Sequence, residues 1–157
     1  MKKAILFSTI AILLSLSACT MDDKLNLCVT QEENIEKYIN QNFPDATVYV
    51  TDTGISRIVM IDGKGTPAQK GDSVVFSYAG FTFNNGPSTQ FASGIAKAKL
   101  GDKSLITGLD EGITGMMQEE EAYIAFSARY GFFDEAIAAL PTMTPLIYYV
   151  KLEYAYR

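Results

Sequence analysis

The chain has 157 residues, of which 48% are hydrophobic and 20% charged, a composition that suits a single globular domain. Histidine is absent and cysteine occurs only twice, so Ser-His-Asp and Cys-His catalytic systems, HExxH metal sites and zinc ribbons lack their required residues. The 13 Lys and Arg side chains against 18 Asp and Glu give a net charge of −5, which disfavours binding to nucleic acid.

Residues 1–18 have the features of a bacterial export signal. Two lysines precede an apolar run over residues 4–16, which is too short to span a bilayer as a mature helix. The residues Leu-Ser-Ala-Cys at positions 16–19 resemble the lipobox of bacterial lipoproteins, in which the cysteine sulfur receives a diacylglyceryl group. We therefore predict that residues 1–18 are removed and that acyl chains such as palmitate anchor Cys19 to a membrane. An ordinary secretory signal with a chance cysteine is the alternative.

The residues after Cys19 indicate a compartment. Thr20, directly after the lipidated cysteine, is typical of outer-membrane sorting, and the Asp-Asp-Lys sequence at positions 22–24 resembles the acidic export tag of surface lipoproteins of the Bacteroidota. With Cys19 lipidated, Cys28 has no partner for an intramolecular disulfide, even in an exported compartment. We expect a protein that is lipid-anchored in the cell envelope, on the periplasmic or surface face of the outer membrane.

A tether and a helix are predicted next. Residues 19–29 are polar and mixed, as expected of a lipidated tether between membrane and fold. Thr30 and Glu33 form a capping box, and the apolar residues after them share one helical face until Pro44 ends the run. This face is expected to pack the helix, residues 30–43, on the domain.

Three strands are predicted after this helix. Residues 46–50 and 55–62 flank a turn containing Asp and Gly, which favours a hairpin and completes an N-terminal unit of residues 30–62. A loop with Gly and Pro occupies residues 63–71. Residues 73–83 then alternate as a half-buried strand and end at an Asn-Asn-Gly-Pro turn.

A glycine-rich helix and two strands are predicted in the remaining chain. Four apolar residues from Ile106 to Met116 share one helical face, but three glycines among them each cost the helix about 1 kcal/mol, so only tertiary packing would hold it. Alternation over residues 122–126 and 146–156 predicts strands, the last with its even-numbered residues on one face. The three glutamates at positions 119–121 are interpreted as a solvated acidic turn. Helices and strands together predict an α+β domain with an antiparallel sheet.

Three blocks of residues between positions 63 and 152 occur in a distinctive order. The first is Gly63-Lys64-Gly65, Pro67, Lys70-Gly71-Asp72 and Tyr78-Ala79-Gly80; the second is Gly101, Leu105-Ile106, Gly108-Leu109, Glu111-Gly112 and Met116; the third is Ala128-Arg129-Tyr130-Gly131, Leu140-Pro141 and residues 146–152. In content and spacing they resemble the FKBP-type peptidyl-prolyl cis-trans isomerase family. The resemblance implies that residues 63–157 form an FKBP-like α+β domain, an antiparallel half-barrel sheet wrapped on a short helix, with residues 30–43 as an extra N-terminal helix.

The resemblance also implies a pocket. Its catalytic residues would be Tyr78, Phe91, Ile106, Tyr130 and Tyr148, and its other substrate-binding residues Leu105, Leu109 and Leu140. In this family the X-Pro amide twists out of plane in an apolar pocket without a nucleophile, cofactor or metal, against a barrier of about 18–20 kcal/mol. The backbone N–H of Ile106 and the hydroxyl of Tyr130 would hold substrate carbonyls. The absence of histidine is therefore no obstacle.

The sequence departs from the family pattern at this pocket. Ala92 stands where the family usually has Asp, and Leu109 stands where it usually has Trp. Ala96 and Ala98 stand where aromatic residues often line the wall, and Tyr148 replaces a usual Phe. These changes imply a wider pocket and weak isomerase activity.

The function expected from these observations is that of a monomeric envelope lipoprotein that isomerises or binds X-Pro segments of exported, unfolded polypeptides. Two alternatives remain open. The same groove in a non-catalytic FKBP-like module would serve a chaperone or adaptor, and the fold alone would serve as a structural module of an envelope complex. Tyr78, Leu105, Leu109 and Tyr148 also fit a purely structural role in a core.

Overall fold

The chain folds into six strands and two α-helices over the residues that the computed structural model describes, 20–138 and 140–157. The elements are α1 (Met21–Asn42), β1 (Val48–Val50), β2 (Ser56–Ile61), β3 (Ser73–Phe83), β4 (Pro87–Lys99), α2 (Thr107–Ile113), β5 (Glu121–Phe126), the 3₁₀ helix η1 (Ala128–Tyr130) and β6 (Leu146–Tyr156). The predicted signal peptide and Cys19 lie outside the described residues. Within the described part of the chain, no helix is long and apolar enough to cross a membrane.

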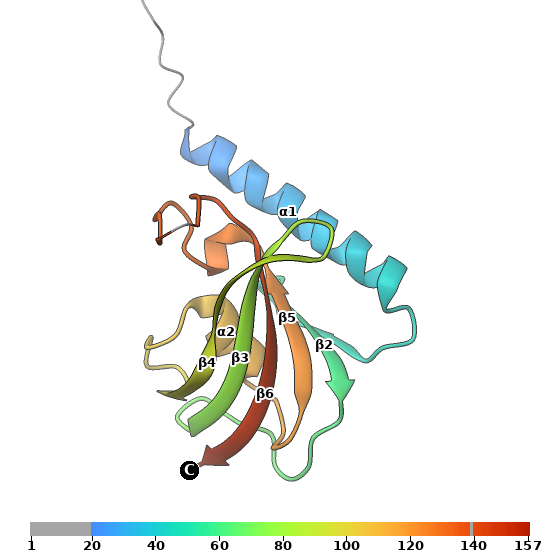
Figure 1. Cartoon of the computed structure of the whole chain (residues 1–157), viewed down its shortest axis with the longest axis vertical. Helices are drawn as coiled ribbons and strands as arrows, with labels where there is room; N and C mark the ends of the chain where they lie inside the picture. Colours follow the sequence, from blue (N-terminus) through green and yellow to red (C-terminus); the bar gives the residue numbers. More distant parts are fainter. Residues whose placement is uncertain (1–19, 139) are drawn as a thin grey trace, which may run out of the picture.

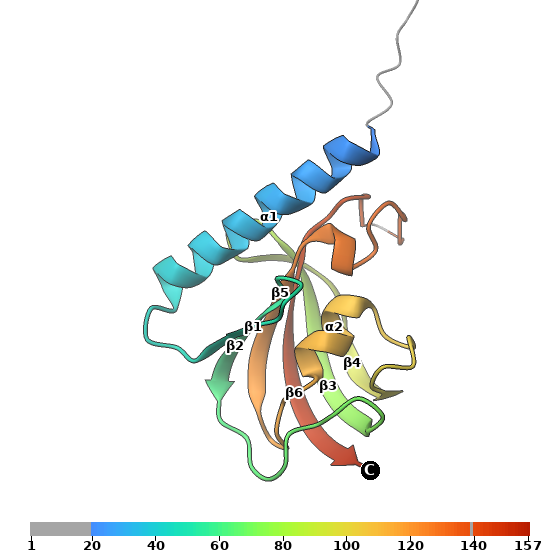
Figure 2. The same cartoon turned by 180° about the vertical axis from the view of Figure 1, so that it is seen from behind.

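All six of these strands form one antiparallel sheet in the order β1-β2-β5-β6-β3-β4. Register shifts after Gly80 bend the long β3–β4 pair, and Figure 2 shows the sheet curving around α2, which lies on its concave face. β1 and β2 pair as a hairpin, with Val48 opposite Ile58. The predicted α+β fold, a half-barrel sheet wrapped on a short helix, is confirmed.

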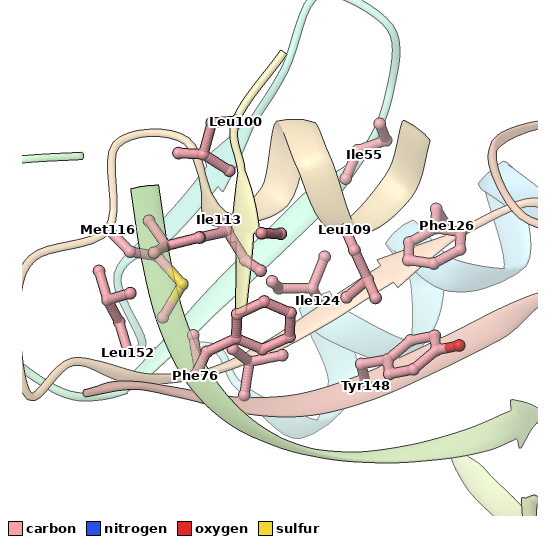
Figure 3. Close-up of a cluster of buried hydrophobic side chains, with 14 of the residues drawn as sticks. Ile55, Phe76, Leu100, Leu109, Ile113, Met116, Ile124, Phe126, Tyr148 and Leu152 are labelled. Atoms are coloured by element: carbon pink, nitrogen blue, oxygen red, sulfur yellow. The ribbon is translucent and has the colours of Figure 1, made fainter. Parts of the chain in front are cut away.

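The main core fills the space between α2 and the concave face of the sheet. Alternate residues of β3, β5 and β6 point toward the helix, as the period-2 patterns predict, and Figure 3 shows how they meet Leu109 and Ile113 of α2. The residues that the patterns place in this core are all at most 1% exposed: Val74, Phe76, Ile113, Phe126 and Leu152.

Two glycines let α2 lie directly on β5. A β-carbon at Gly108 would come within 3.0 Å of the Phe126 ring, and one at Gly112 would come equally close to the Ile124 side chain. The close packing of the helix on the sheet therefore offsets the helix propensity that the two glycines cost. This confirms that tertiary packing holds the helix.

A buried arginine fixes the other end of α2. Arg57 of β2 donates hydrogen bonds to the carbonyl oxygens of Gly112 (3.2 Å), Thr114 (2.9 Å) and Gly115 (3.4 Å), which satisfy the C-terminal end of the helix. Its Nε lies 3.3 Å from Oε1 of Glu120, within ion-pair distance although not aligned for a hydrogen bond. Burial lowers the pKa of Arg57, and the Glu120 carboxylate acts in the opposite direction.

The acidic turn at positions 119–121 is solvated only in part. Glu119 and Glu121 lie 3.5 and 3.9 Å from the ammonium group of Lys151 at the surface. Glu120 between them is only 4% exposed, because it turns inward to meet Arg57. The interpretation of all three glutamates as solvated was therefore wrong for Glu120.

A second core lies on the opposite, convex face of the sheet, beneath α1 (Figure 1). Ile35 and Ile39 of the helix contact Ile58, Ala125 and Ile147 of three neighbouring strands. Tyr38, near the C-terminal end of the helix, closes this core through edge-on contacts of its ring with the rings of Phe43 and Phe83. The predicted packing of an N-terminal helix on the domain is confirmed.

The start of α1 differs from the prediction. The helix begins at Met21, where Thr20 and Asp23 form the capping box: the Thr20 N–H donates to the Asp23 carboxylate (3.0 Å), and the Asp23 N–H donates to the Thr20 hydroxyl (3.3 Å). The Thr20 hydroxyl, which donates to the Asp23 carboxylate at 2.8 Å, and then the Thr20 N–H lower the pKa of Asp23. Thr30 instead lies inside the helix and donates to the Asn26 carbonyl (3.2 Å), so the predicted start at Thr30 was wrong and residues 21–29 are helical rather than a tether.

Two further features of the sheet were not predicted. β4 was missed because its side chains are mostly small or polar, which is sufficient for an edge strand. In β6 a bulge leaves Glu153 outside the residue-by-residue pairing with β3, and this reverses which side chains face the core beyond it. Ala155 therefore contacts the main core, whereas Tyr154 and Tyr156, expected on that face, are half exposed.

Gly112→Ala is expected to destabilise the protein although alanine favours helices. Its methyl group would overlap Ile124 and force α2 away from β5, so the free energy of unfolding should fall by about 1–3 kcal/mol in urea denaturation. Gly94→Ala is the control, because its β-carbon would lie 3.7 Å from the nearest atom, the Tyr78 hydroxyl oxygen. Equal stability of the two variants would contradict the close helix–sheet contact.

Candidate functional site

The main cleft of about 720 Å³ opens between α2, the β3–β4 pair and the loop that joins β5 to β6, residues 127–145, here called the cleft loop. Its lining is aliphatic and aromatic with a few neutral polar side chains: Phe76, Tyr78, Thr82, Thr89, Gln90, Phe91, Ala92, Ala96, Ser104, Leu105, Ile106, Leu109, Phe132, Ile137, Ala138, Leu140, Pro141 and Tyr148. Among these described lining residues there is no Asp, Glu, Lys or Arg. The cleft is therefore suited to an apolar ligand rather than to acid–base chemistry.

Most of the predicted pocket residues meet in this cleft. Seven of the eight line it: Tyr78, Phe91, Leu105, Ile106, Leu109, Leu140 and Tyr148. They come from β3, β4, the segment that leads into α2, the helix itself, the cleft loop and β6. Residues far apart in the sequence thus form one surface.

Leu109 and Tyr148 form the deep part of the cleft. Leu109 is held there by α2 and is only 6% exposed. The Tyr148 ring lies almost parallel to the Phe126 ring, with centroids 5.9 Å apart, and meets the edge of the Phe91 ring at 5.7 Å. Gly80 makes this arrangement possible, because a β-carbon there would collide with the Tyr148 ring.

The polar groups of the cleft are few. Figure 3 shows the Tyr148 hydroxyl pointing away from the aliphatic core residues, and burial raises the pKa of this phenol. Ile106 is the N-cap of α2, and its carbonyl accepts the N–H groups of Leu109 and Asp110, both at 3.0 Å. The Ile106 N–H itself has no backbone partner among the described residues, so it can donate to a ligand at the rim of the cleft.

Tyr130 is the predicted residue that does not line the cleft. It lies in η1, packs against the edge of the main core, and has the Arg129 guanidinium 5.1 Å from its ring centroid. Burial raises the pKa of Tyr130. Its predicted role at a substrate carbonyl stays a prediction.

The sequence patterns missed one side of the cleft. The cleft loop contributes four further lining residues, Phe132, Ile137, Ala138 and Pro141, and β4 contributes Thr89 and Gln90. A loop has no periodicity that would reveal which side chains turn inward. The available signal was the run of apolar residues in a segment too long for a simple connection.

Comparison with known families agrees with this geometry. Residues 64–153 match the sequence profile of the family described as FKBP-type peptidyl-prolyl cis-trans isomerase. FK506-binding protein 1 of Aspergillus oryzae is 29% identical over 111 residues, which cover 63% of this chain and 96% of that protein. FK506-binding protein 1 of Gibberella zeae is 28% identical over 107 residues, which cover 64% and 96% of the two chains.

Solved structures with the same fold include bacterial proteins. A peptidyl-prolyl cis-trans isomerase of Pseudomonas syringae pv. tomato matches 85% of this chain and 96% of its own with a TM-score of 0.69 at 14% identity. FkpA from Escherichia coli matches 85% of this chain with a TM-score of 0.64 at 17% identity, and this chain spans 63% of the length of FkpA. At these identities the likeness concerns the fold alone.

Tyr148→Phe is expected to make the protein lose less stability than the wild type as the pH becomes alkaline. Burial raises the pKa of Tyr148 above the ordinary value of about 10, so the folded protein keeps a proton that the unfolded chain releases. The stabilisation that the Tyr148 phenol contributes is fully present below about pH 10 and is lost as the pH rises toward its folded-state pKa. Urea unfolding from about pH 9 to 12 should therefore show a smaller loss of stability in the variant than in the wild type.

The control for this experiment is Tyr156→Phe, at a half-exposed position. It should keep the alkaline loss of the wild type. Tyr149 contributes to the loss in every variant, because its hydrogen bond to Glu121 raises its pKa to about 12. Identical alkaline profiles of Tyr148→Phe and the wild type would show that the Tyr148 phenol is not buried in the fold.

Proposed function

This chain belongs to the FKBP-type peptidyl-prolyl cis-trans isomerase family, and we propose that its cleft isomerises X-Pro peptide bonds. The observation that carries the proposal is the cleft itself, an apolar cavity formed within the residues that match the family, with no charged side chain among its described lining residues. Its volume is sufficient for a prolyl ring and the neighbouring side chains. The reaction requires no group that accepts or releases a proton, so the lack of histidine is compatible with it.

The chemistry depends on desolvation and orientation. A planar X-Pro amide is held by resonance, with a rotation barrier of about 18–20 kcal/mol. In the cleft the prolyl ring would lie on Leu109, beside the contacting aromatic rings of Tyr148 and Phe91, in surroundings that disfavour the polar planar amide relative to the less polar twisted one. The free N–H of Ile106 would donate to a substrate carbonyl and fix the peptide across the helix end.

Two positions limit the expected rate. Ala92 lines the cleft but offers no carboxylate to Tyr78, which lines it as well, and Leu109 gives the prolyl ring less flat surface than an indole would. We therefore expect slow catalysis. A non-catalytic binding module remains the second candidate function, and the same two residues are the reason to test it.

The test is catalysed isomerisation of X-Pro peptides by the soluble chain, residues 20–157. We expect a measurable rate that Tyr130→Phe lowers and that Ala92→Asp with Leu109→Trp raises by about ten-fold, provided the indole fits. Thermal melting checks that each variant folds. If the wild type and the folded double variant are both inactive and titration with proline peptides shifts no NMR resonance, the cleft is not an isomerase site.

Binding without catalysis would favour the second candidate. In that outcome, NMR titration with unfolded polypeptides would shift cleft resonances while the isomerisation rate stays at the uncatalysed value. Peptides with and without proline then distinguish a prolyl-specific module from a general chaperone or adaptor.

We further propose that the protein acts as a lipoprotein of the cell envelope, anchored through Cys19, with exported polypeptides as its substrates. The support is the ordered pattern of lysines, apolar run and lipobox over residues 1–19, since two or three acyl chains give lasting membrane attachment. We place the anchor in the outer membrane because Thr20 is typical of outer-membrane sorting and acidic residues follow it. Because α1 begins at Met21, the domain would lie close to the membrane rather than on a long tether.

Cys19→Ala is expected to abolish lipidation and leave an unprocessed precursor. Labelling of cells with a palmitate analogue, followed by electrophoresis, measures both effects. The control is Cys28→Ala, which removes the other cysteine and should leave processing and labelling unchanged. A Cys19→Ala protein that is still cleaved and still fractionates with membranes would contradict the lipoprotein proposal.

A further inference from the structure

We propose that α1 is a positioning element of the isomerase site, in which Gln31 and Glu32 hold the cleft loop in the conformation that binds substrate. The inference rests on the proposed isomerase function. It concerns a helix that lies outside residues 64–153, the part of the chain that matches the family.

The cleft loop is held internally by short turns and one bridge. Apart from η1 and the isolated antiparallel bridge between Ile137 and Leu140, it consists of turns and irregular backbone between β5 and β6, and the Met143 N–H donates to the Phe133 carbonyl at 2.6 Å. Nevertheless it supplies one side of the cleft through five residues: Phe132, Ile137, Ala138, Leu140 and Pro141. Long loops are more mobile than the strands they connect, so contacts from another element add to these internal bonds in holding the surface ordered.

Gln31 joins the two ends of this loop. Its side-chain oxygen accepts the N–H of Ala128 at 2.9 Å, and its side-chain nitrogen donates to the carbonyl of Met143 at 2.8 Å. The side chain is 7% exposed, so water competes little for either bond. One amide thus satisfies both backbone groups and fixes the distance between the start and the end of the loop.

Glu32 holds the segment that carries Tyr130. One carboxylate oxygen accepts hydrogen bonds from the Ser127 hydroxyl and from Nε of Arg129, both at 2.7 Å, and the other oxygen pairs with the Arg129 guanidinium. This two-point pair fixes the plane of the guanidinium, which lies over the Tyr130 ring. Glu32 thereby acts on Tyr130 through Arg129.

The same face of α1 continues toward the helix N-terminus. Lys24 pairs with Asp134 of the loop at 2.5 Å, and Cys28 is completely buried at one-turn spacing between Lys24 and Gln31–Glu32. The first half of α1 therefore contacts the cleft loop, whereas Ile35 and Ile39 of its second half contact the sheet. Because the sheet core fixes the helix, the helix can in turn fix the loop.

The expected effect of losing these contacts is weaker substrate binding. A loosened loop must be ordered when the peptide binds, and this entropic cost raises KM more than it lowers kcat. Glu32→Ala and Gln31→Ala should each lower kcat/KM by about five-fold or more. Glu32→Gln keeps an acceptor for Ser127 and Arg129 and should recover part of the loss. Glu33→Ala and Glu36→Ala, exposed on the same helix, are the matched controls and should leave kcat/KM unchanged.

The second measurement is amide hydrogen exchange, which does not depend on activity. Residues 128–138 and 140–144 should exchange faster in Glu32→Ala and Gln31→Ala than in the wild type, while β3 and α2 keep their protection. A double-mutant cycle of Glu32→Gln with Arg129→Gln should show that the two changes are not additive in kcat/KM.

The outcomes separate the two proposals. If the wild type does not isomerise X-Pro bonds, the proposed function fails, and hydrogen exchange still decides whether α1 orders the loop. Faster exchange confined to the loop, with a raised KM and rescue by Glu32→Gln, supports the inference. Unchanged hydrogen exchange in the loop overturns the inference. It is also overturned if kcat/KM falls together with a uniform loss of exchange protection across the protein, and if the Glu33→Ala control behaves in the same way.

Discussion

The close contact between α2 and β5 is the constraint on which the rest of the structure depends. Gly108 and Gly112 remove the side chains that would separate the helix from Phe126 and Ile124, so the helix lies deep in the curve of the sheet. At that depth Leu109 becomes the floor of the cleft, and Ile106 places its N–H at the rim. A helix held further out would fill the cleft or lose contact with the strands. The glycines therefore determine the site as well as the fold.

α2 has only 7 residues, and an isolated helix of this length is not stable in water because forming its first turn is unfavourable. Arg57 supplies the missing stabilisation by donating to three carbonyls near the helix C-terminal end. A buried guanidinium would be unfavourable without a counter-charge, which explains why Glu120 turns inward from an otherwise solvated turn. The ion pair is thus part of the positioning of Leu109 and Ile106, although it lies at the other end of the helix.

The sequence predicts the parts of the fold that follow a regular period. β3, β5, β6 and α2 alternate or repeat strongly, and seven pocket residues were placed through the family resemblance. Capping boxes at Thr20 and at Thr30 both fit the start of α1, and the helix uses the one at Thr20, which brings Cys28 into the helix as a buried residue. The bulge at Glu153 reverses the faces of Tyr154 and Tyr156 without any pattern of its own. The position of the cleft loop was inaccessible because it depends on contacts with a helix about 100 residues earlier in the chain.

The alternation of β5 explains how a helix on the convex face affects a cleft on the concave face. Ile124 and Phe126 point to the main core, and Ala125 between them points to the core beneath α1. The strand ends at Phe126, and the next two residues, Ser127 and Ala128, bond directly to Glu32 and Gln31. The base of the cleft and the start of the cleft loop are therefore joined by a few consecutive residues, packed from both sides. In a site whose chemistry requires only desolvation and orientation, such packing determines how well the substrate is held.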